Sequence, residues 1–198
     1  MTEVRPSATG VTVIKIGGGL GAIPGALELV CGAVGEASKA HSLVVVPGGG
    51  PFAEAVRAFD STTGLSAGAA HWMAILAMDQ YAHVLADRIS QAVLVEEPGV
   101  LAESVGHGRA VVLAPSRWMR AADVLPHTWE VTSDSIAAFV AGALDAACLV
   151  LIKPAASGDP LDSYFASALP ADMPYFVLSW DRIAELSSII SGATAGAG

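Results

Sequence analysis

Two glycine triplets, each behind an apolar run, have the residue type and spacing to bind phosphate groups. Gly17-Gly18-Gly19 follows the run 11–16, and Gly48-Gly49-Gly50 follows the run 43–46 and Pro47. Glycine lets the backbone come close to a ligand, and successive N–H groups of such a turn can point at one anion. A helix that begins directly behind the turn adds partial positive charge. Two such triplets predict an anion site more strongly than a single tight turn would.

Lys15 lies within the first apolar run, one residue away from the glycines that follow it. Burying an ammonium group there is costly unless an anion or a carboxylate meets it. We therefore expect Lys15 to contact phosphoryl groups, with a strand-end lysine that reaches solvent as the alternative. Neither triplet belongs to a G-x-x-x-x-G-K-[ST] or a G-x-G-x-x-G motif, which disfavours a P-loop NTPase and a Rossmann dehydrogenase.

A third cluster of polar residues, from His127 to Ser135, reads His-Thr-Trp-Glu-Val-Thr-Ser-Asp-Ser. Ser133 or Asp134 is predicted to cap the helix that follows. Capping does not explain the whole cluster in a chain of which charged residues make up only 15%. The carboxylate of Asp134 could also orient lysines of the site through its charge.

The elements that must position these residues are short apolar strands alternating with helices. Strands are expected over residues 11–16, 43–46, 92–95, 110–113, 148–152 and 175–178. Helices are expected over residues 23–39, 51–59, 66–87, 133–145 and 180–190. Strands that are apolar throughout indicate a mainly parallel sheet covered on both faces, so the expected fold is a three-layer α/β/α sandwich. Both glycine triplets would then lie at the edge where open α/β sheets bind ligands.

The composition indicates one globular domain. The 198 residues divide into a polar tail over 1–10, a domain over 11–191 and a flexible Gly/Ala-rich tail over 192–198. A net charge of -9 with scattered basic residues disfavours a nucleic-acid partner. The small share of charged residues favours a homo-oligomer.

No apolar leader and no membrane span is expected, and both cysteines lie in apolar stretches, so cytoplasmic localisation is the expectation. Cys and His residues do not cluster at zinc-site spacing, so no residue is assigned as a metal ligand.

Together these motifs resemble the amino acid kinase superfamily. The shared layout is Lys15 before a glycine turn, a second strand ending in the stretch 47–52, and the stretch 132–135 entering a helix. Within that superfamily the chain most resembles the small kinases of methanofuran biosynthesis. The supporting stretches are 46–53, 76–80, 113–116 and 127–135, and the resemblance covers residues 11–152.

The resemblance implies the amino acid kinase (carbamate kinase-like) fold and an ATP-dependent phosphotransferase. Its acceptor would be a small phosphorylated molecule, (5-(aminomethyl)furan-3-yl)methyl phosphate or a related intermediate of methanofuran-type one-carbon cofactor biosynthesis. The implied cofactors are ATP and Mg²⁺. The implied partners are small molecules, without nucleic acid or membrane.

The resemblance also implies a role for each site residue. The catalytic residues would be Lys15 at the transferring phosphoryl group, Asp134 orienting the lysine and Mg²⁺, and Lys153 at a β-phosphate. The ATP phosphates would bind at Gly17, Gly18 and Gly19. The acceptor would bind at Gly48, Gly49, Gly50, Asp79, His127, Trp129 and Ser133. Among these, Asp79 is the candidate partner of a substrate amine.

Two departures from the family concern the nucleotide side. Gly19 stands where relatives usually have serine, and a Val-Asp-Gly segment usually follows the strand that ends here near Ile152. This chain continues with Lys153-Pro154 and soon reaches Leu161-Asp162, so the nucleotide-side segment is shortened. Two alternatives follow: a catalytically impaired homologue acting as a ligand-binding or regulatory subunit, and an oxyanion-binding storage protein of the same superfamily.

Overall fold

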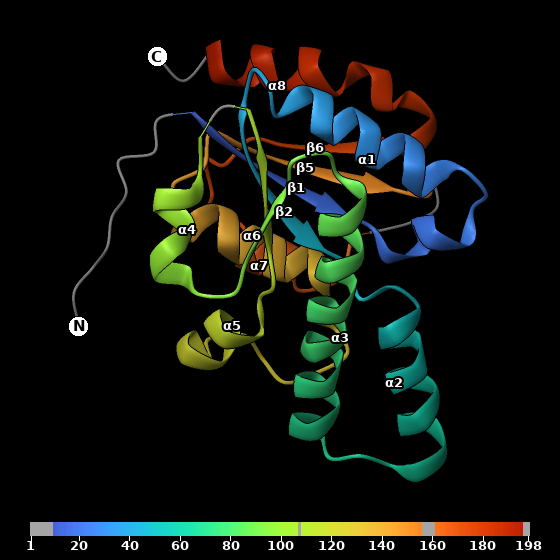
Figure 1. The fold of residues 1–198 in the computed structure, drawn as a ribbon. Coiled ribbons are helices and arrows are strands. Elements are labelled where there is room, and N and C mark those ends of the chain that lie inside the picture. The colour runs from blue at the N-terminus through green and yellow to red at the C-terminus, as the bar shows by residue number, and fades with distance from the viewer. Residues whose placement is uncertain (1–9, 107, 156–160, 196–198) are drawn as a thin grey trace.

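Short runs of apolar residues form one parallel sheet at the centre of the molecule, seen in the computed structural model in Figure 1. The structure describes residues 10–106, 108–155 and 161–195. Within them the sheet has six strands in the order β3-β4-β2-β1-β5-β6. Their bounds are β1 Val11–Ile16, β2 Ser42–Pro47, β3 Val93–Val95, β4 Ala110–Leu113, β5 Cys148–Lys153 and β6 Tyr175–Ser179. All six predicted strands are confirmed.

Strand β1 lies in the middle of the sheet, and its pairings fix the position of the site. It pairs in parallel with β2, with Ile16 opposite Pro47, and with β5, with Lys15 opposite Leu151. Every residue of β1 and of β5 is buried. This burial explains why these strands are apolar throughout and do not alternate with polar residues.

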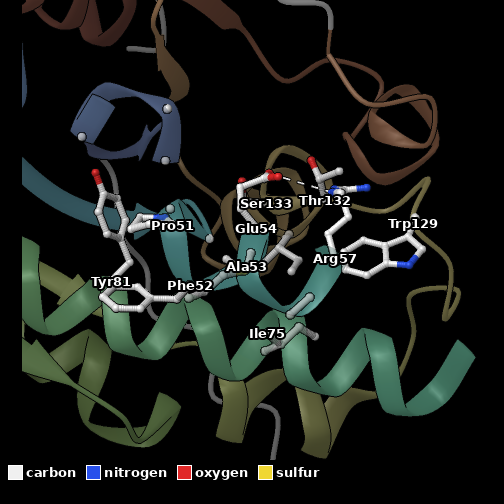
Figure 2. A pocket seen from close by; sticks show the side chains of 18 of the residues that line it. Pro51, Phe52, Ala53, Glu54, Arg57, Ile75, Tyr81, Trp129, Thr132 and Ser133 are labelled. Atoms are coloured by element: carbon white, nitrogen blue, oxygen red, sulfur yellow. Dashed lines mark ion pairs between the residues drawn. The ribbon is translucent and has the colours of Figure 1, made fainter. Parts of the chain in front are cut away.

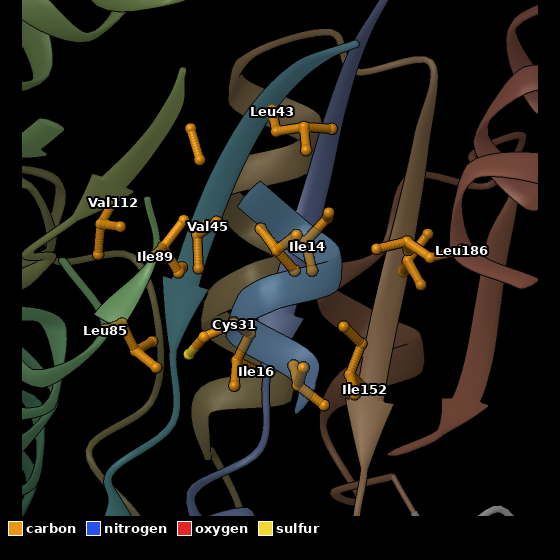
Figure 3. Packing of buried hydrophobic residues seen from close by; sticks show 14 of the residues in the cluster. Ile14, Ile16, Cys31, Leu43, Val45, Leu85, Ile89, Val112, Ile152 and Leu186 are labelled. Carbon is orange, nitrogen blue, oxygen red and sulfur yellow. The ribbon is translucent and has the colours of Figure 1, made fainter. Parts of the chain in front are cut away.

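Helices cover both faces of the sheet, so the predicted three-layer α/β/α sandwich is confirmed (Figure 1). One face packs against α1, α8 and the C-terminal half of α3, and the other packs against α4, α5, α6 and α7. Figure 3 shows the first of these layers, where Cys31 of α1 and Leu186 of α8 lie over Ile14 and Ile152. The α-helices are α1 Ala26–Ala37, α2 Gly50–Thr63, α3 Ala67–Arg88, α4 Pro98–Ser104, α5 Ser116–Ala122, α6 Ser133–Ala143, α7 Phe165–Ala168 and α8 Leu186–Ala195.

Several helix boundaries differ from the sequence prediction. The chain after β1 forms a 3₁₀ helix, η1 (Gly18–Ala22), and α1 begins only after Gly25, whose φ of 77° places it in the left-handed region. The predicted C-terminal helix is a 3₁₀ helix, η2 (Trp180–Glu185), followed by α8. Because α8 reaches Ala195, it enters the stretch expected as a flexible tail. Residues 1–9 and 196–198 of the two expected tails lie outside the described residues.

Helices α2 and α3 form an antiparallel hairpin that projects from the sheet (Figure 1). Gly64, with a φ of 67°, ends α2, and the Ser66 side chain accepts a hydrogen bond from the Ala69 N–H to begin α3. The two helices therefore carry side chains past the edge of the sheet where the glycine turns lie. No helix in the described part of the chain combines the length and the apolar character needed to cross a bilayer.

Candidate active site

The two glycine turns contact each other directly at the carboxyl ends of β1 and β2. A Cβ atom built on Gly18 would lie 2.2 Å from the Gly50 nitrogen, and one on Gly48 would lie 2.4 Å from the Gly18 nitrogen. No other residue type fits at these positions without moving the backbone. The predicted placement of both turns at one edge of the sheet is therefore correct, and the contact explains why glycine is needed there.

Not every glycine N–H of the two turns is available to a ligand. The N–H of Gly17 donates to the Ile152 carbonyl at 2.9 Å, and the N–H of Gly48 donates to the Ile16 carbonyl at 2.8 Å. These two bonds hold the turns against the sheet. Gly18, Gly19 and Gly50, the first residue of α2, line the cavities described below.

Lys15 of β1 and Lys153 of β5 lie on either side of Asp134, at the start of α6. The Lys153 Nζ donates to Asp134 Oδ2 at 2.8 Å, and the Lys15 Nζ lies 2.8 Å from Oδ1 as an ion pair without an aligned hydrogen bond. All three side chains are less than a tenth exposed. The structure thus brings together the three residues expected to be catalytic, which lie far apart in the sequence.

The environment of Asp134 keeps its carboxylate charged. Burial by itself raises the pKa of this group, but the positive charges of Lys15 and Lys153, and the hydrogen bond from Lys153, outweigh burial and lower the pKa below its ordinary value. A fixed negative charge between two ammonium groups holds both lysines in place. The lysines and Asp134 line a cavity of about 500 Å³ together with Gly17, Gly18 and Gly19.

The N-terminus of α6 is held by Asp162, a residue that the sequence analysis did not assign to the site. One carboxylate oxygen of Asp162 accepts the N–H of Thr132 at 2.9 Å, the hydroxyl of Thr132 at 2.7 Å and the N–H of Ser135 at 3.0 Å. Its other oxygen accepts the Ser135 hydroxyl. Thr132 itself is the N-cap, where Ser133 or Asp134 had been predicted. With capping done by Thr132 and Asp162, the Asp134 carboxylate is free to contact the lysines.

A second, larger cavity of about 780 Å³ opens on the other side of the glycine turns. Figure 2 shows its walls: Phe52, Glu54 and Arg57 from α2, Ile75 and Tyr81 from α3, and Trp129, Thr132 and Ser133 near the start of α6. Gly18, Gly19, Trp129 and Thr132 line both cavities, so the two spaces meet beside the glycine turns. A ligand in one cavity can therefore face a ligand in the other.

The stretch of sequence that contains this site matches a known protein family. The sequence model of the amino acid kinase family matches residues 10–155. The chain belongs to the amino acid kinase family. Members of this family are kinases, which is the class of enzyme that the sequence analysis expected.

A sequence relative and several solved structures agree with this assignment. The [5-(aminomethyl)furan-3-yl]methyl phosphate kinase of Methanocaldococcus jannaschii is 31% identical over 103 residues, which are 52% of this chain. The matched part spans 47% of that relative's length. Uridylate kinase from Archaeoglobus fulgidus has a TM-score of 0.69 at 14% identity, over 92% of this chain and 96% of its own. UMP kinase from Bacillus anthracis has a TM-score of 0.67 at 14% identity, over 92% of each chain. The predicted amino acid kinase fold is confirmed.

The residues expected to hold the acceptor are distributed unevenly in this member of the family. Gly49, Gly50, Trp129 and Ser133 line the larger cavity. Gly48 lines neither of the two cavities, and its N–H is bonded to the Ile16 carbonyl.

Trp129 is fixed at the junction of the two cavities by α2. Its Nε1–H donates to Asp60 at 2.7 Å, and the Arg57 guanidinium carbon lies 4.2 Å from the centroid of its ring. This hydrogen bond and the cation–π contact hold the indole between the two ligand spaces.

Asp79 and His127 lie away from the larger cavity. Asp79 accepts the N–H of Ser116 at 3.0 Å and lines neither large cavity. The His127 ring lies 2.8 Å from Asp123 and stacks on the His71 ring at a centroid distance of 4.3 Å. His71, not His127, lines the cavity, and burial lowers its pKa, which favours the neutral imidazole.

Tyr81 is a further residue of the cavity wall that the sequence analysis did not assign. Its ring packs beneath Gly50, where a Cβ would lie 2.9 Å from the ring. Burial raises the pKa of Tyr81 to about 12, and its hydroxyl is buried without a hydrogen-bond partner in the part of the chain that the structure describes. A protonated hydroxyl here can donate to a ligand or a water molecule near the glycine turns.

Proposed function

We propose that this chain is an ATP-dependent phosphotransferase that acts on a small phosphorylated acceptor. The single observation that carries the proposal is the group Lys15–Asp134–Lys153, buried beside two glycine turns that touch. Transfer of a phosphoryl group needs little covalent chemistry from a protein, and it depends on positioning and on neutralising charge. Lysines and backbone N–H groups can supply both.

In this proposal each cavity takes one substrate. The phosphates of ATP lie in the smaller cavity, which Lys15, Lys153, Gly18 and Gly19 line. The acceptor lies in the larger cavity, with its phosphate at the start of α2. Since the cavities meet at Gly18 and Trp129, an acceptor oxygen can approach the terminal phosphate in line.

The chain's own residues provide little for a magnesium ion. The described residues contain no cluster of three His, Cys, Asp or Glu side chains, and both oxygens of Asp134 face lysines. Magnesium prefers carboxylates together with substrate phosphates. We therefore assign Mg²⁺ to the phosphates of ATP and derive no step from a metal bound by the protein.

The first acceptor to test is (5-(aminomethyl)furan-3-yl)methyl phosphate, because the curated relative is named for that substrate. The purified protein should convert it to the diphosphate with Mg-ATP, detected as a new pair of coupled diphosphate signals by ³¹P NMR. Uridine monophosphate serves as the comparison acceptor, since the structural neighbours are UMP kinases. Turnover of the second acceptor alone would keep the phosphotransferase and reject the first substrate.

The alternative is a homologue that binds an acceptor but no longer transfers phosphate. Two features of the nucleotide side favour this alternative. The connection after β5 is short, with Pro154 directly after Lys153, and the first glycine turn has Gly19 next to Pro154. A Cβ on Gly19 would lie 3.0 Å from the Pro154 ring, so the two departures from the family belong together. Calorimetric titration with Mg-ATP separates the two proposals: absence of binding at millimolar nucleotide supports the non-catalytic homologue.

A further inference from the structure

The larger cavity contains an acidic side chain that binding of a phosphate alone does not explain. Most of its lining is apolar or backbone, and among the described residues Glu54 is its carboxylate and Arg57 its guanidinium. Both extend from α2 toward Thr132 and Ser133 at the start of α6 (Figure 2). A carboxylate here would repel a purely anionic acceptor.

Neighbouring groups leave the Glu54 carboxylate able to bind a cation. Its ion pair with Arg57 is long, at 3.9 Å between Oε1 and Nε, and the Glu54 side chain is 74% exposed. The Arg57 guanidinium is also engaged by Trp129, over whose ring it lies. Across the cavity, His71 favours its neutral form and does not compete as a second cation.

The spacing along α2 matches a small ligand with charges at both ends. Glu54 lies four residues after Gly50, the first residue of α2. At a rise of about 1.5 Å per residue this is about 6 Å along the helix. A ligand whose phosphate lies at the start of α2 would therefore place a group one helical turn further on within reach of Glu54. Apolar side chains such as Phe52 and Ile75 also line the cavity, where they can contact the part of the ligand between its two charged ends.

We propose that Glu54 binds a primary ammonium group of the acceptor, so that the larger cavity selects small organic phosphates that also carry an amine. This inference rests on the proposed function, because it assumes that the acceptor phosphate binds at the start of α2. It assigns to Glu54 the role expected of Asp79, whose carboxylate accepts the Ser116 N–H outside the cavity. Glu54 attracts the correct acceptor and repels phosphates without an amine.

The test compares two acceptors that differ only in the amine: (5-(aminomethyl)furan-3-yl)methyl phosphate and its hydroxymethyl analogue. Binding is measured by calorimetry without nucleotide, for the wild type, Glu54→Gln and Glu36→Gln. Glu36 is the matched control, because it also forms an i,i+3 ion pair, with Lys39, on an exposed helix surface but lines neither large cavity. The wild type and the control should prefer the amine by about tenfold, as one charge-assisted hydrogen bond allows. Glu54→Gln should lose most of that preference.

The outcomes distinguish this inference from the proposed function. If the wild type binds both acceptors equally, or if Glu54→Gln keeps the preference, the role of Glu54 is overturned while the phosphotransferase stands. If neither acceptor binds, the acceptor of the proposed function is rejected and the inference with it. Preference for the amine that is lost only in Glu54→Gln supports the role of Glu54 and the acceptor of the proposed function, and the ³¹P NMR assay tests the transfer itself.

Discussion

Lys15 is the residue whose removal tests the chemistry most simply. In Lys15→Met the side chain keeps an apolar stem inside β1 but loses the ammonium group beside Asp134. Lys153 still contacts Asp134, so the fold should be retained. Loss of one preorganised donor at developing charge costs about 100-fold to 1,000-fold in turnover. We expect a loss of at least that size in a steady-state assay of ADP release.

The control for Lys15→Met is Lys39→Met, which removes a lysine exposed on the surface and paired with Glu36. It should keep wild-type turnover. Activity within a few-fold of wild type in Lys15→Met, with a melting temperature that shows the fold intact, would contradict a role for Lys15 at the transferred group.

Asp134 should matter for stability as well as for activity. Asp134→Asn removes the carboxylate that two buried lysines share. Breaking a buried ion pair from one side costs about 3–5 kcal/mol, so a clear drop in the free energy of unfolding is expected in urea titrations. Asp145→Asn, at an exposed turn after α6, is the control and should change stability by no more than about 0.5 kcal/mol.

The stability difference between wild type and Asp134→Asn should depend on pH, because the pKa of Asp134 is lowered in the folded protein. A carboxyl with a lowered folded-state pKa contributes stability that is complete above its unfolded value and is lost as the pH falls through the folded one. The difference in melting temperature between wild type and Asp134→Asn should thus be constant above the ordinary value of 3.8 and become smaller below it. A difference that already shrinks between pH 7 and pH 5 would show that another group is responsible.

A single residue could be predicted from the sequence where burying it without a partner would cost much free energy. A lysine inside an apolar strand needs a partner, and this reasoning pointed to Lys15 and its carboxylate. Asp79 and His127 were assigned through the resemblance, and the structure places them outside the larger cavity. Glu54 has no such signal, because an exposed glutamate on a helix is ordinary in sequence and becomes informative only when the cavity is known.

At the scale of elements, the two glycine turns act as one unit because Gly18 lies against Gly50. Gly18→Ala places a Cβ 2.2 Å from the Gly50 nitrogen, and this contact is with backbone that has no rotamer to change. The turns should separate, with a loss of stability of about 1–3 kcal/mol and a larger loss of turnover. Thermal unfolding and the ADP assay measure the two effects.

The matched control is Gly32→Ala, in α1. A Cβ on Gly32 meets nothing within 4 Å, and alanine favours a helix over glycine by about 0.5–1 kcal/mol. This variant should be slightly more stable than wild type and fully active. If Gly18→Ala behaves like Gly32→Ala, the two turns do not need the close contact that the structure gives them.

Strands were easier to predict than helices for a physical reason. Runs that are apolar at every position, such as β1 and β5, have few interpretations other than buried parallel strands. Helices α4, α5 and α7 have seven, seven and four residues, too few for a helical period to appear in the sequence. The cap of α6 was placed one or two residues late, because the contribution of Asp162 comes from a distant part of the chain.

At the scale of the whole molecule, the fold brings three separate segments to one edge of the sheet. Lys15, Asp134 and Lys153 come from β1, α6 and β5, and the parallel order of the central strands places them together. The projecting hairpin of α2 and α3 adds the wall of the larger cavity (Figure 2). The sandwich and the shared edge could be predicted from the strand pattern. The existence of two cavities that meet could not, because it depends on how α3 and the segment around Trp129 pack.

The most direct test is a crystal structure of the protein with a non-hydrolysable ATP analogue, Mg²⁺ and the acceptor phosphate. The account predicts the terminal phosphate of the analogue within hydrogen-bonding distance of the Lys15 Nζ, in the cavity that Lys153 also lines, and the acceptor in the larger cavity beyond Gly18. Nucleotide bound elsewhere on the molecule, with the ion pairs of Asp134 buried and untouched by phosphate, would contradict it.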